Sequence, residues 1–287
     1  MAYTIEPLSN QHCNTGENPY WHPADKCVYW TDIPAGVLYR YDPSNKQTET
    51  VYRGPQVGGF TLQADGKFLL FRETDIATFD PKSRKVETLL EYTDDTMTRF
   101  NDVHADSVGR VYAGTIAKNW KPIGSLYCID LDGSVRKVAT GSACGNGLAF
   151  TPDEKHLYWT CSSRRRIFRY EWDGKTGDLK NEIVFYDAPE GEGTPDGMAM
   201  DEHGNLWSCR WDGKRIVIIN PEGKAIDTIW FDVAKVSCAI FGGEQNNDLF
   251  VTTAGGKKDS TSADGTLYRI TTQTLGRARF HSRIKLK

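Results

Sequence analysis

Apolar and polar residues alternate over short stretches along the whole chain, and acidic or glycine-containing turns separate these stretches. Alternation with a period of two, broken by Asp-Gly, Asp-Pro and Glu-Gly turns, is typical of antiparallel β-strands. Convincing helical periodicity is absent. One phrase, an apolar strand, a turn and an aromatic strand, recurs as YWHPADKCVYWTD from Tyr20, FTLQADGKFLLFR from Phe60, VHADSVGRVYAGT from Val103, LAFTPDEKHLYWT from Leu148, MAMDEHGNLWSCR from Met198 and AIFGGEQNNDLFVTT from Ala239.

A second hairpin-like phrase follows each of these units, so each repeat carries four short strands. Six such repeats, spaced by about 40 to 50 residues, predict an all-β six-bladed β-propeller with four antiparallel strands per blade. Radial repetition protects the sheet edges in this architecture. No linker interrupts the pattern, so we predict a single domain over residues 1–287. We expect a strand around Tyr3 to Glu6 to close the ring beside the C-terminal segment RARFHSRIKLK.

Composition narrows the class of protein. Hydrophobic residues make up 39% of the chain and aromatic residues 11%, which supports a sizeable core. The net charge of −3 argues against a nucleic-acid partner. No apolar run approaches the ~18 residues of a membrane span, so we expect no membrane partner. The seven cysteines are scattered, odd in number and free of CxxC pairs, which favours reduced thiols and a cytoplasmic location.

Aligning five of the repeats reveals a set of equivalent polar positions. The innermost strand of each propeller blade runs along the central channel, so equivalent positions on these strands form a ring. Two carboxylates and two amides in such a ring suit a hard divalent cation on the central axis. The alternative is that these residues only cap turns at strand entries. Nine positions before Lys26, Lys67, Arg110, Lys155 and Asn205 lie Glu17, Gly58, Asn101, Asn146 and Asp196.

These blocks also resemble a known family over nearly the whole chain. The resemblance is to the senescence marker protein 30 / gluconolactonase / regucalcin family, whose fold is the six-bladed propeller. The similar blocks are GENPYW (Gly16 to Trp21), RFNDVHADSVGRVYAGT (Arg99 to Thr115), GNGLAFTPD (Gly145 to Asp153), PDGMAMDEHGNLW (Pro195 to Trp207) and AIFGGEQNNDLFVTT (Ala239 to Thr253).

The resemblance implies roles for five residues. It implies a divalent metal bound by Glu17, Asn146 and Asp196, and substrate contacts from Arg99 and Asn101. It also implies that Asp196 is the acid/base. Calcium is the first choice of metal, with Mn²⁺, Zn²⁺, Mg²⁺ and Fe²⁺ as alternatives.

The chain departs from the family pattern at two positions. Asn18 follows Glu17, where the family commonly has a small residue. Lys118 stands where the animal members carry an acidic residue that contacts substrate. A lysine at the mouth would bind an anionic or strongly polar substrate, and the alternative is a solvated loop lysine. Trp120 in the following segment is available as a wall of the site.

The predicted function is metal-dependent hydrolysis of small cyclic esters, with sugar (aldono-)lactones as the small-molecule substrates. A bound cation would polarise the lactone carbonyl, while Asp196 assists the attacking water. Arg99 and Asn101 would hold substrate oxygens. Two alternatives stay open: a metal-dependent phosphotriester hydrolase, and a non-catalytic propeller that binds a metal or ligand. No GxSxG nucleophile elbow occurs, which disfavours a serine hydrolase.

Overall fold

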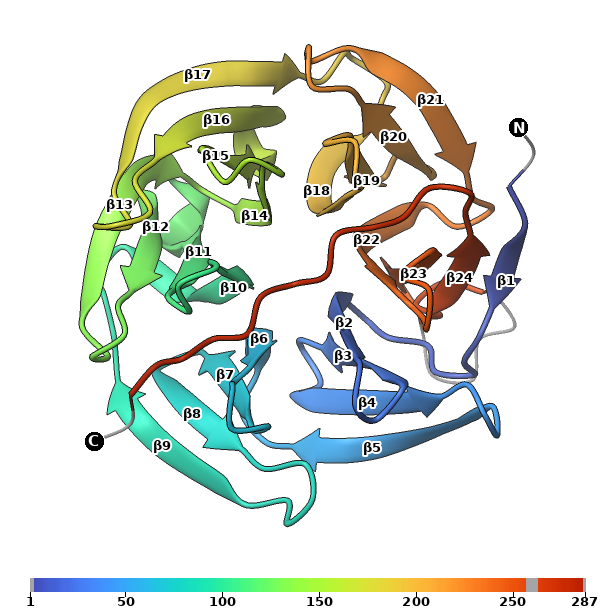
Figure 1. Cartoon of the computed structure of the whole chain (residues 1–287), viewed down its shortest axis with the longest axis horizontal. Helices are drawn as coiled ribbons and strands as arrows, with labels where there is room; N and C mark the ends of the chain where they lie inside the picture. Colours follow the sequence, from blue (N-terminus) through green and yellow to red (C-terminus); the bar gives the residue numbers. More distant parts are fainter. Residues whose placement is uncertain (1–2, 257–262, 286–287) are drawn as a thin grey trace. The chain divides into compact units, whose positions relative to one another are not determined.

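The structure is a computed structural model that describes residues 3–256 and 263–285. Within these residues the chain forms six four-stranded sheets in which neighbouring strands run antiparallel. The helical elements of this described part are two short 3-10 turns, η1 (Lys118–Trp120) and η2 (Ser162–Arg164). The fold is therefore a six-bladed β-propeller with four antiparallel strands per blade, as the repeats predict (Figure 1).

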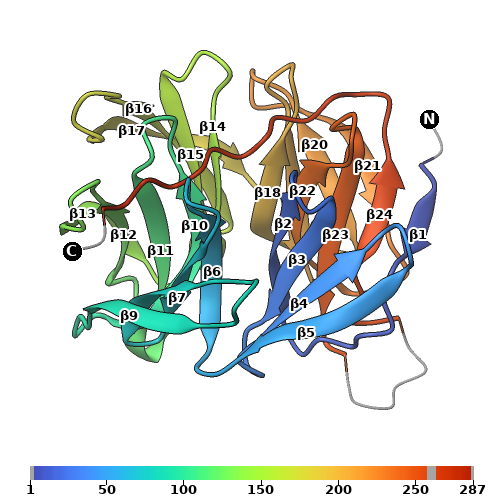
Figure 2. The same ribbon diagram turned by 60° about the horizontal axis from the view of Figure 1, so that its bottom comes forward.

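The chain divides into two compact units of three blades each. Unit 1 comprises Met1–Gly54 and Tyr186–Ala278. In this unit the strand β22 packs against both β2 and β18, and Figure 2 shows β2 and β22 side by side. Its blades are β2 (Gly16–His22), β3 (Cys27–Asp32), β4 (Val37–Asp42) and β5 (Gln47–Arg53); β18 (Thr194–Met200), β19 (Leu206–Trp211), β20 (Arg215–Ile219) and β21 (Ala225–Trp230); and β22 (Lys235–Gly242), β23 (Asp248–Ala254), β24 (Tyr268–Thr271) and β1 (Ile5–Pro7).

Unit 2 comprises Pro55–Phe185 and Arg279–Lys287. Here β10 packs against both β6 and β14. The expectation of one domain over residues 1–287 stays a prediction. The blades of unit 2 are β6 (Val57–Leu62), β7 (Phe68–Arg72), β8 (Asp75–Phe79) and β9 (Val86–Glu91); β10 (Met97–Ala105), β11 (Val111–Ala117), β12 (Gly124–Ile129) and β13 (Val135–Ser142); and β14 (Gly145–Phe150), β15 (His156–Cys161), β16 (Arg166–Trp172) and β17 (Leu179–Asp187), whose last two residues belong to unit 1.

Burial falls from the inner strands of a blade to the outer strand. In β7 every residue of FLLFR is buried, whereas in β9 most residues of VETLLE are exposed. A strand that is covered on both faces needs an apolar residue at nearly every position, but an edge strand needs only one apolar face. This difference explains why β7 reads as a nearly continuous apolar run while β9 carries charged residues.

The N-terminal strand closes a blade, but its partner differs from the expected one. β1 pairs antiparallel with β24, with Ile5 opposite Ile270, so the prediction of a partner in the C-terminal segment is wrong. The apolar alternation of β24 buries Tyr268 and Ile270 in the core of unit 1 and leaves a strand edge that β1 covers. Within the C-terminal segment, Ser282 N–H instead donates to Leu62 O at the end of β6, at 2.9 Å.

The prediction of free thiols is confirmed, whereas the cytoplasmic location stays a prediction. All seven cysteines are free thiols and all are buried. Among the described residues, no helix has both the length and the apolar character needed to cross a membrane.

Candidate metal and substrate site

Every innermost strand contains a β-bulge close to its first residues. A bulge adds one residue to a strand, bends it and turns a side chain to a new direction. The alternation of apolar and polar residues does not predict these bulges. They lie between Glu17 and Tyr20 in β2, Val57 and Gly59 in β6, Phe100 and Val103 in β10, Asn146 and Leu148 in β14, Pro195 and Met198 in β18, and Val236 and Cys238 in β22.

The four predicted oxygen donors all lie at these bulges, although not at one identical ladder position. Glu17 and Asn146 are the last paired residues before the bulge, opposite Thr31 and Thr160. Asn101 and Asp196 lie inside their bulges, one residue after the last pair. All four side chains are buried, with Glu17 4% exposed and the other three 5% exposed.

In unit 1 the candidate ligands are carboxylates on the two strands that flank β22. Glu17 lies on β2, where its Oε2 accepts a hydrogen bond from Asn18 N–H at 3.1 Å. Asn18 adopts a left-handed backbone with φ of 47° inside this bulge. Asp196 lies on β18. Buried carboxylates are costly unless a cation or hydrogen-bond donors compensate them, so this arrangement fits a cation.

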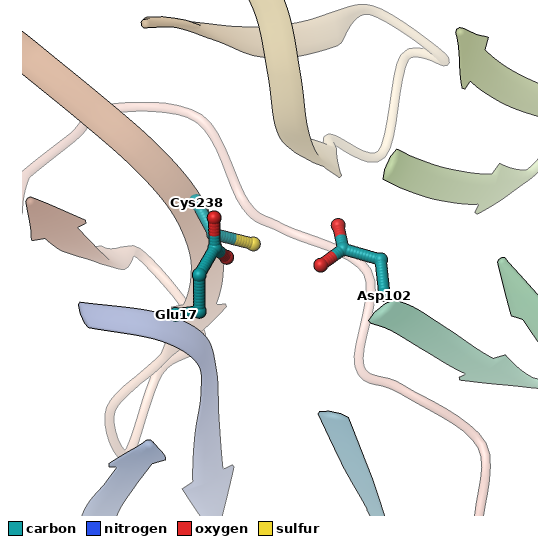
Figure 3. Close-up of side chains that lie close together, drawn as sticks. All are labelled: Glu17, Asp102 and Cys238. Carbon is teal, nitrogen blue, oxygen red and sulfur yellow. The ribbon is translucent and has the colours of Figure 1, made fainter. Parts of the chain in front are cut away.

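Cys238 on β22 is a neighbour of both ligand strands in unit 1, and sequence reasoning missed it. Its Sγ and a carboxylate oxygen of Glu17 lie within 4.8 Å of one another (Figure 3). A Cβ atom at Gly197 would come within 2.3 Å of this Sγ, which explains the glycine that follows Asp196. The repeat could have located it. Cys238 lies nine positions before Asn247 in the sixth repeat, which is the spacing that defines the five ring positions in the other repeats.

A buried ion pair fixes the loop that leads into Asp196. Arg210, which lies opposite Pro195 in the β18–β19 ladder, has a fully buried side chain. Its Nε donates to Glu192 Oε1 at 2.8 Å, and Tyr186 Oη donates to the other carboxylate oxygen at 2.7 Å. Since Glu192 precedes Asp196 by four residues, these bonds restrain the chain just before the candidate catalytic residue.

In unit 2 the candidate groups form a hydrogen-bonded chain. Arg99 Nη1 donates to Asn101 Oδ1 at 2.6 Å, and Asn101 Nδ2 donates to Asn146 Oδ1 at 2.5 Å and to Gly145 O at 2.9 Å. Asn146 Nδ2 donates in turn to Ser162 Oγ at 2.7 Å. Each amide is thereby held in one orientation.

Gly58 is the one position of the predicted ring without a polar side chain, and its environment explains why. A Cβ atom there would lie 2.1 Å from the carbonyl oxygen of Phe100 on the neighbouring strand β10. The close approach of the two backbones excludes a side chain at this position. Glycine at Gly58 thus allows β10 to present Asn101.

Asp102 is a further buried acidic residue of unit 2 that sequence reasoning left without a role (Figure 3). It is 4% exposed, and within the described part of the chain its Oδ1 has no hydrogen-bond partner. Burial raises the pKa of this carboxyl to about 6, although the guanidinium groups of Arg279 and Arg99 oppose the shift. An unpartnered carboxylate oxygen beside Asn101 fits a site that receives a cation or a polar substrate.

The remaining predicted substrate residues lie at the same end of the β10–β11 hairpin as Asn101. Arg99 is half-buried on β10 and lies opposite Ile116. Lys118 begins η1, directly after β11, and is exposed; its Nζ lies 3.8 Å from a carboxylate oxygen of Asp95. The substrate role of Lys118 stays a prediction.

Comparison with known proteins places this arrangement in context. Residues 15–255 match the model of the SMP-30/Gluconolactonase/LRE-like region. Pentonolactonase XacC of Haloferax volcanii is 35% identical over 99% of this chain and 99% of its own length, and regucalcin of Xenopus laevis is 30% identical over 93% and 94%. A solved structure of a luciferin-regenerating enzyme is similar with a TM-score of 0.89 and 27% identity, over 98% of this chain and 100% of that one.

Proposed function

The chain belongs to the SMP-30/gluconolactonase/LRE-like family, and we propose from this premise that it hydrolyses small sugar lactones with the help of one divalent cation. It is a lactonase enzyme of that family. The observation that carries the cation-dependent proposal is the set of four buried oxygen donors at the bulges of β2, β10, β14 and β18. The full-length similarity to a pentonolactonase supports a sugar lactone as the substrate.

Glu17, Asn146 and Asp196 are the proposed metal ligands. Their oxygen atoms are hard donors, which favours calcium and admits Mn²⁺ or Mg²⁺, while Zn²⁺ and Fe²⁺ stay alternatives. The similarity to regucalcin is consistent with this choice. A bound divalent cation would supply Lewis acidity toward the lactone carbonyl oxygen.

The chain's own residues carry the proton and the substrate in this proposal. One carboxylate oxygen of Asp196 takes the proton of the attacking water and returns it to the ring oxygen that leaves. Arg99 and Asn101 donate hydrogen bonds to substrate oxygens, which orients the lactone. Lys118, two residues beyond Ile116, would contact the polar groups that project from the ring.

The free thiols bear on where the protein works. Seven buried, reduced cysteines suit a reducing compartment, so we place the enzyme in the cytoplasm as part of this proposal.

The proposed function is tested with a panel of five-carbon and six-carbon aldonolactones at neutral pH. Acid release above the spontaneous rate is expected, EDTA should abolish it, and added Ca²⁺ or Mn²⁺ should restore it. Metal content after native purification gives an independent measurement.

The two alternative functions predict different results in the same assays. Turnover of phosphotriesters with no turnover of lactones would favour the phosphotriester hydrolase. Metal binding without turnover of either class would leave a non-catalytic binding propeller.

A further inference from the structure

Trp120 is unusual among the large apolar side chains. It is 65% exposed, the highest exposure of any large hydrophobic residue in the described part of the chain. Ile123, three residues further along the chain, is 43% exposed. A tryptophan side chain offers about 150–250 Å² of surface whose burial is favourable, so an exposed indole forgoes a large stabilising contribution unless it meets a ligand.

The backbone holds this side chain in an unfavourable conformation. Asn119 and Trp120 are consecutive left-handed residues with φ of 56° and 53°. Asparagine tolerates this region, but a bulky residue such as tryptophan rarely adopts it. Strain of this kind persists only where the surrounding structure imposes it, and it concentrates at ligand-binding and catalytic sites.

Backbone hydrogen bonds fix the turn that carries Trp120. Lys118 N–H donates to Thr96 O at 3.0 Å, and Lys121 N–H donates back to Lys118 O at 3.3 Å. Ala117 N–H, just before the turn, donates to Ala143 O at 2.9 Å. Backbone hydrogen bonds therefore hold the turn on both sides of Asn119 and Trp120.

The position of the turn relates Trp120 to the candidate substrate groups of unit 2. In the antiparallel β10–β11 ladder, Met97 lies opposite Ala117 and Arg99 lies opposite Ile116. The turn therefore continues from the end of β11 that lies beside Arg99, two residues before Asn101. The turn that carries the indole therefore lies at the end of this blade where the polar chain begins.

Another exposed tryptophan, Trp230, shows what makes Trp120 distinctive. Trp230 is 58% exposed, but the guanidinium of Arg215 lies over its ring at 4.0 Å from the centroid. That ring face is already occupied by a cation–π contact. Within the described residues, neither an aromatic ring nor a cationic group covers Trp120 in this way.

We propose that Trp120 is a stacking platform that binds one face of the sugar ring and so contributes to substrate specificity. The C–H bonds on one face of a sugar lactone form an apolar patch, which the electron-rich indole face attracts, while the hydroxyls stay free for Arg99 and Asn101. The inference rests on the proposed lactonase function and adds to it a residue that determines specificity for the substrate ring.

The test compares Trp120→Ala and Trp120→Phe with Trp230→Ala as the matched control. Trp120→Ala should raise KM for aldonolactones about tenfold with kcat changed less than about twofold, since stacking is worth roughly that factor in binding. Trp120→Phe should restore most of the loss. Trp230→Ala should behave like wild type, and the metal affinity of all three variants should be unchanged.

A binding measurement separates this inference from the proposed function. Titration with the corresponding aldonolactam, a cyclic analogue whose amide resists hydrolysis, should quench tryptophan emission in the wild type and in Trp230→Ala, but not in Trp120→Ala. Wild-type KM and quenching in Trp120→Ala would overturn the platform and leave the lactonase intact. If the wild type hydrolyses no lactone, the proposed function fails. Titration with the lactones then decides, because quenching that requires Trp120 supports the platform and its absence overturns it.

Discussion

The two units present different chemistry at the bulges of their innermost strands. Unit 1 offers carboxylates, Glu17 and Asp196, on the strands beside β22. Unit 2 offers amides, Asn101 and Asn146, joined in a hydrogen-bonded chain that starts at Arg99. At the predicted ring positions, blades built on the same repeat thus supply carboxylates in unit 1 and amides in unit 2, where Asp102 is an additional buried carboxyl.

The two units differ in what offsets the free-energy cost of burying their polar groups. The amides of unit 2 hydrogen-bond to one another and to Ser162. These bonds offset most of the free-energy cost of burying the amides. Buried carboxylates gain much more from a cation, because their charge is desolvated. We therefore expect the carboxylates of unit 1 to contribute more to cation affinity than Asn146 does, and Arg99 and Asn101 of unit 2 to govern substrate orientation.

The largest effect is expected at Asp196 in unit 1. Asp196→Asn keeps the shape of the turn but removes the charge and the proton acceptor, so activity at saturating metal should fall at least ~10²-fold. The thermal transition of the metal-free variant should change little. The measurements are lactone turnover and Tm without metal.

Asp201→Asn is the matched control for this substitution. Asp201 lies five residues later and is 1% exposed; its carboxylate accepts hydrogen bonds from Asn205 and from Trp207 Nε1. This variant should lower Tm and leave kcat and metal affinity near wild type. Wild-type turnover in Asp196→Asn would show that Asp196 only shapes the turn and does not take part in catalysis.

Glu17→Gln should weaken metal affinity by about 10²-fold, because even residues outside the first coordination shell typically cost 10–100-fold. Activity should recover partly at high metal concentration, since the proton acceptor is still present. Calorimetric titration with Ca²⁺ and Mn²⁺ measures the effect. Unchanged affinity for both metals would show that the charge of unit 1 does not hold the cation.

A smaller, tenfold effect is expected for the amide chain of unit 2. Asn101→Ala removes the acceptor of Arg99 and the donor to Asn146, so KM should rise about tenfold while metal affinity changes less than in Glu17→Gln. Tm should fall, since the variant leaves buried groups without partners at a cost of about 1–3 kcal/mol. Ser162→Ala, which touches only the far end of the chain, should have a weaker effect on KM. A larger loss of metal affinity in Asn101→Ala than in Glu17→Gln would reverse the assignment of the two units.

The smallest effect concerns Asp102 and pH. Its carboxyl has a pKa of about 6 in the folded protein against 3.8 for the ordinary value, so between these limits the folded state binds a proton that the unfolded chain does not. The stability contributed by this group is present below about pH 4 and is lost as the pH rises to about 6. Asp102→Asn removes the cost of the buried charge, so in metal-free protein it should raise Tm by a few degrees at pH 7 and by much less at pH 4.5. Thermal scans at both pH values measure the difference, and an equal shift at both would contradict the raised pKa.

The sequence alone determined the blades and predicted the residue types of the candidate site. Alternation with turn residues is a local property, so it fixes the number of strands in each repeat. The repeat also located Glu17, Asn101, Asn146 and Asp196 at the bulges of the innermost strands, because corresponding positions in successive units of the chain occupy similar, although not identical, places in successive blades.

The tertiary structure decided what depends on contacts between distant segments. A bulge arises from the pairing of two strands, so it cannot be predicted from the sequence of either strand alone. The buried environment of Asp102, the approach of Cys238 to Gly197 and the pairing of β1 with β24 all join residues from different strands. Desolvation and steric exclusion act on the neighbours that folding brings together, which is why only the folded chain shows them.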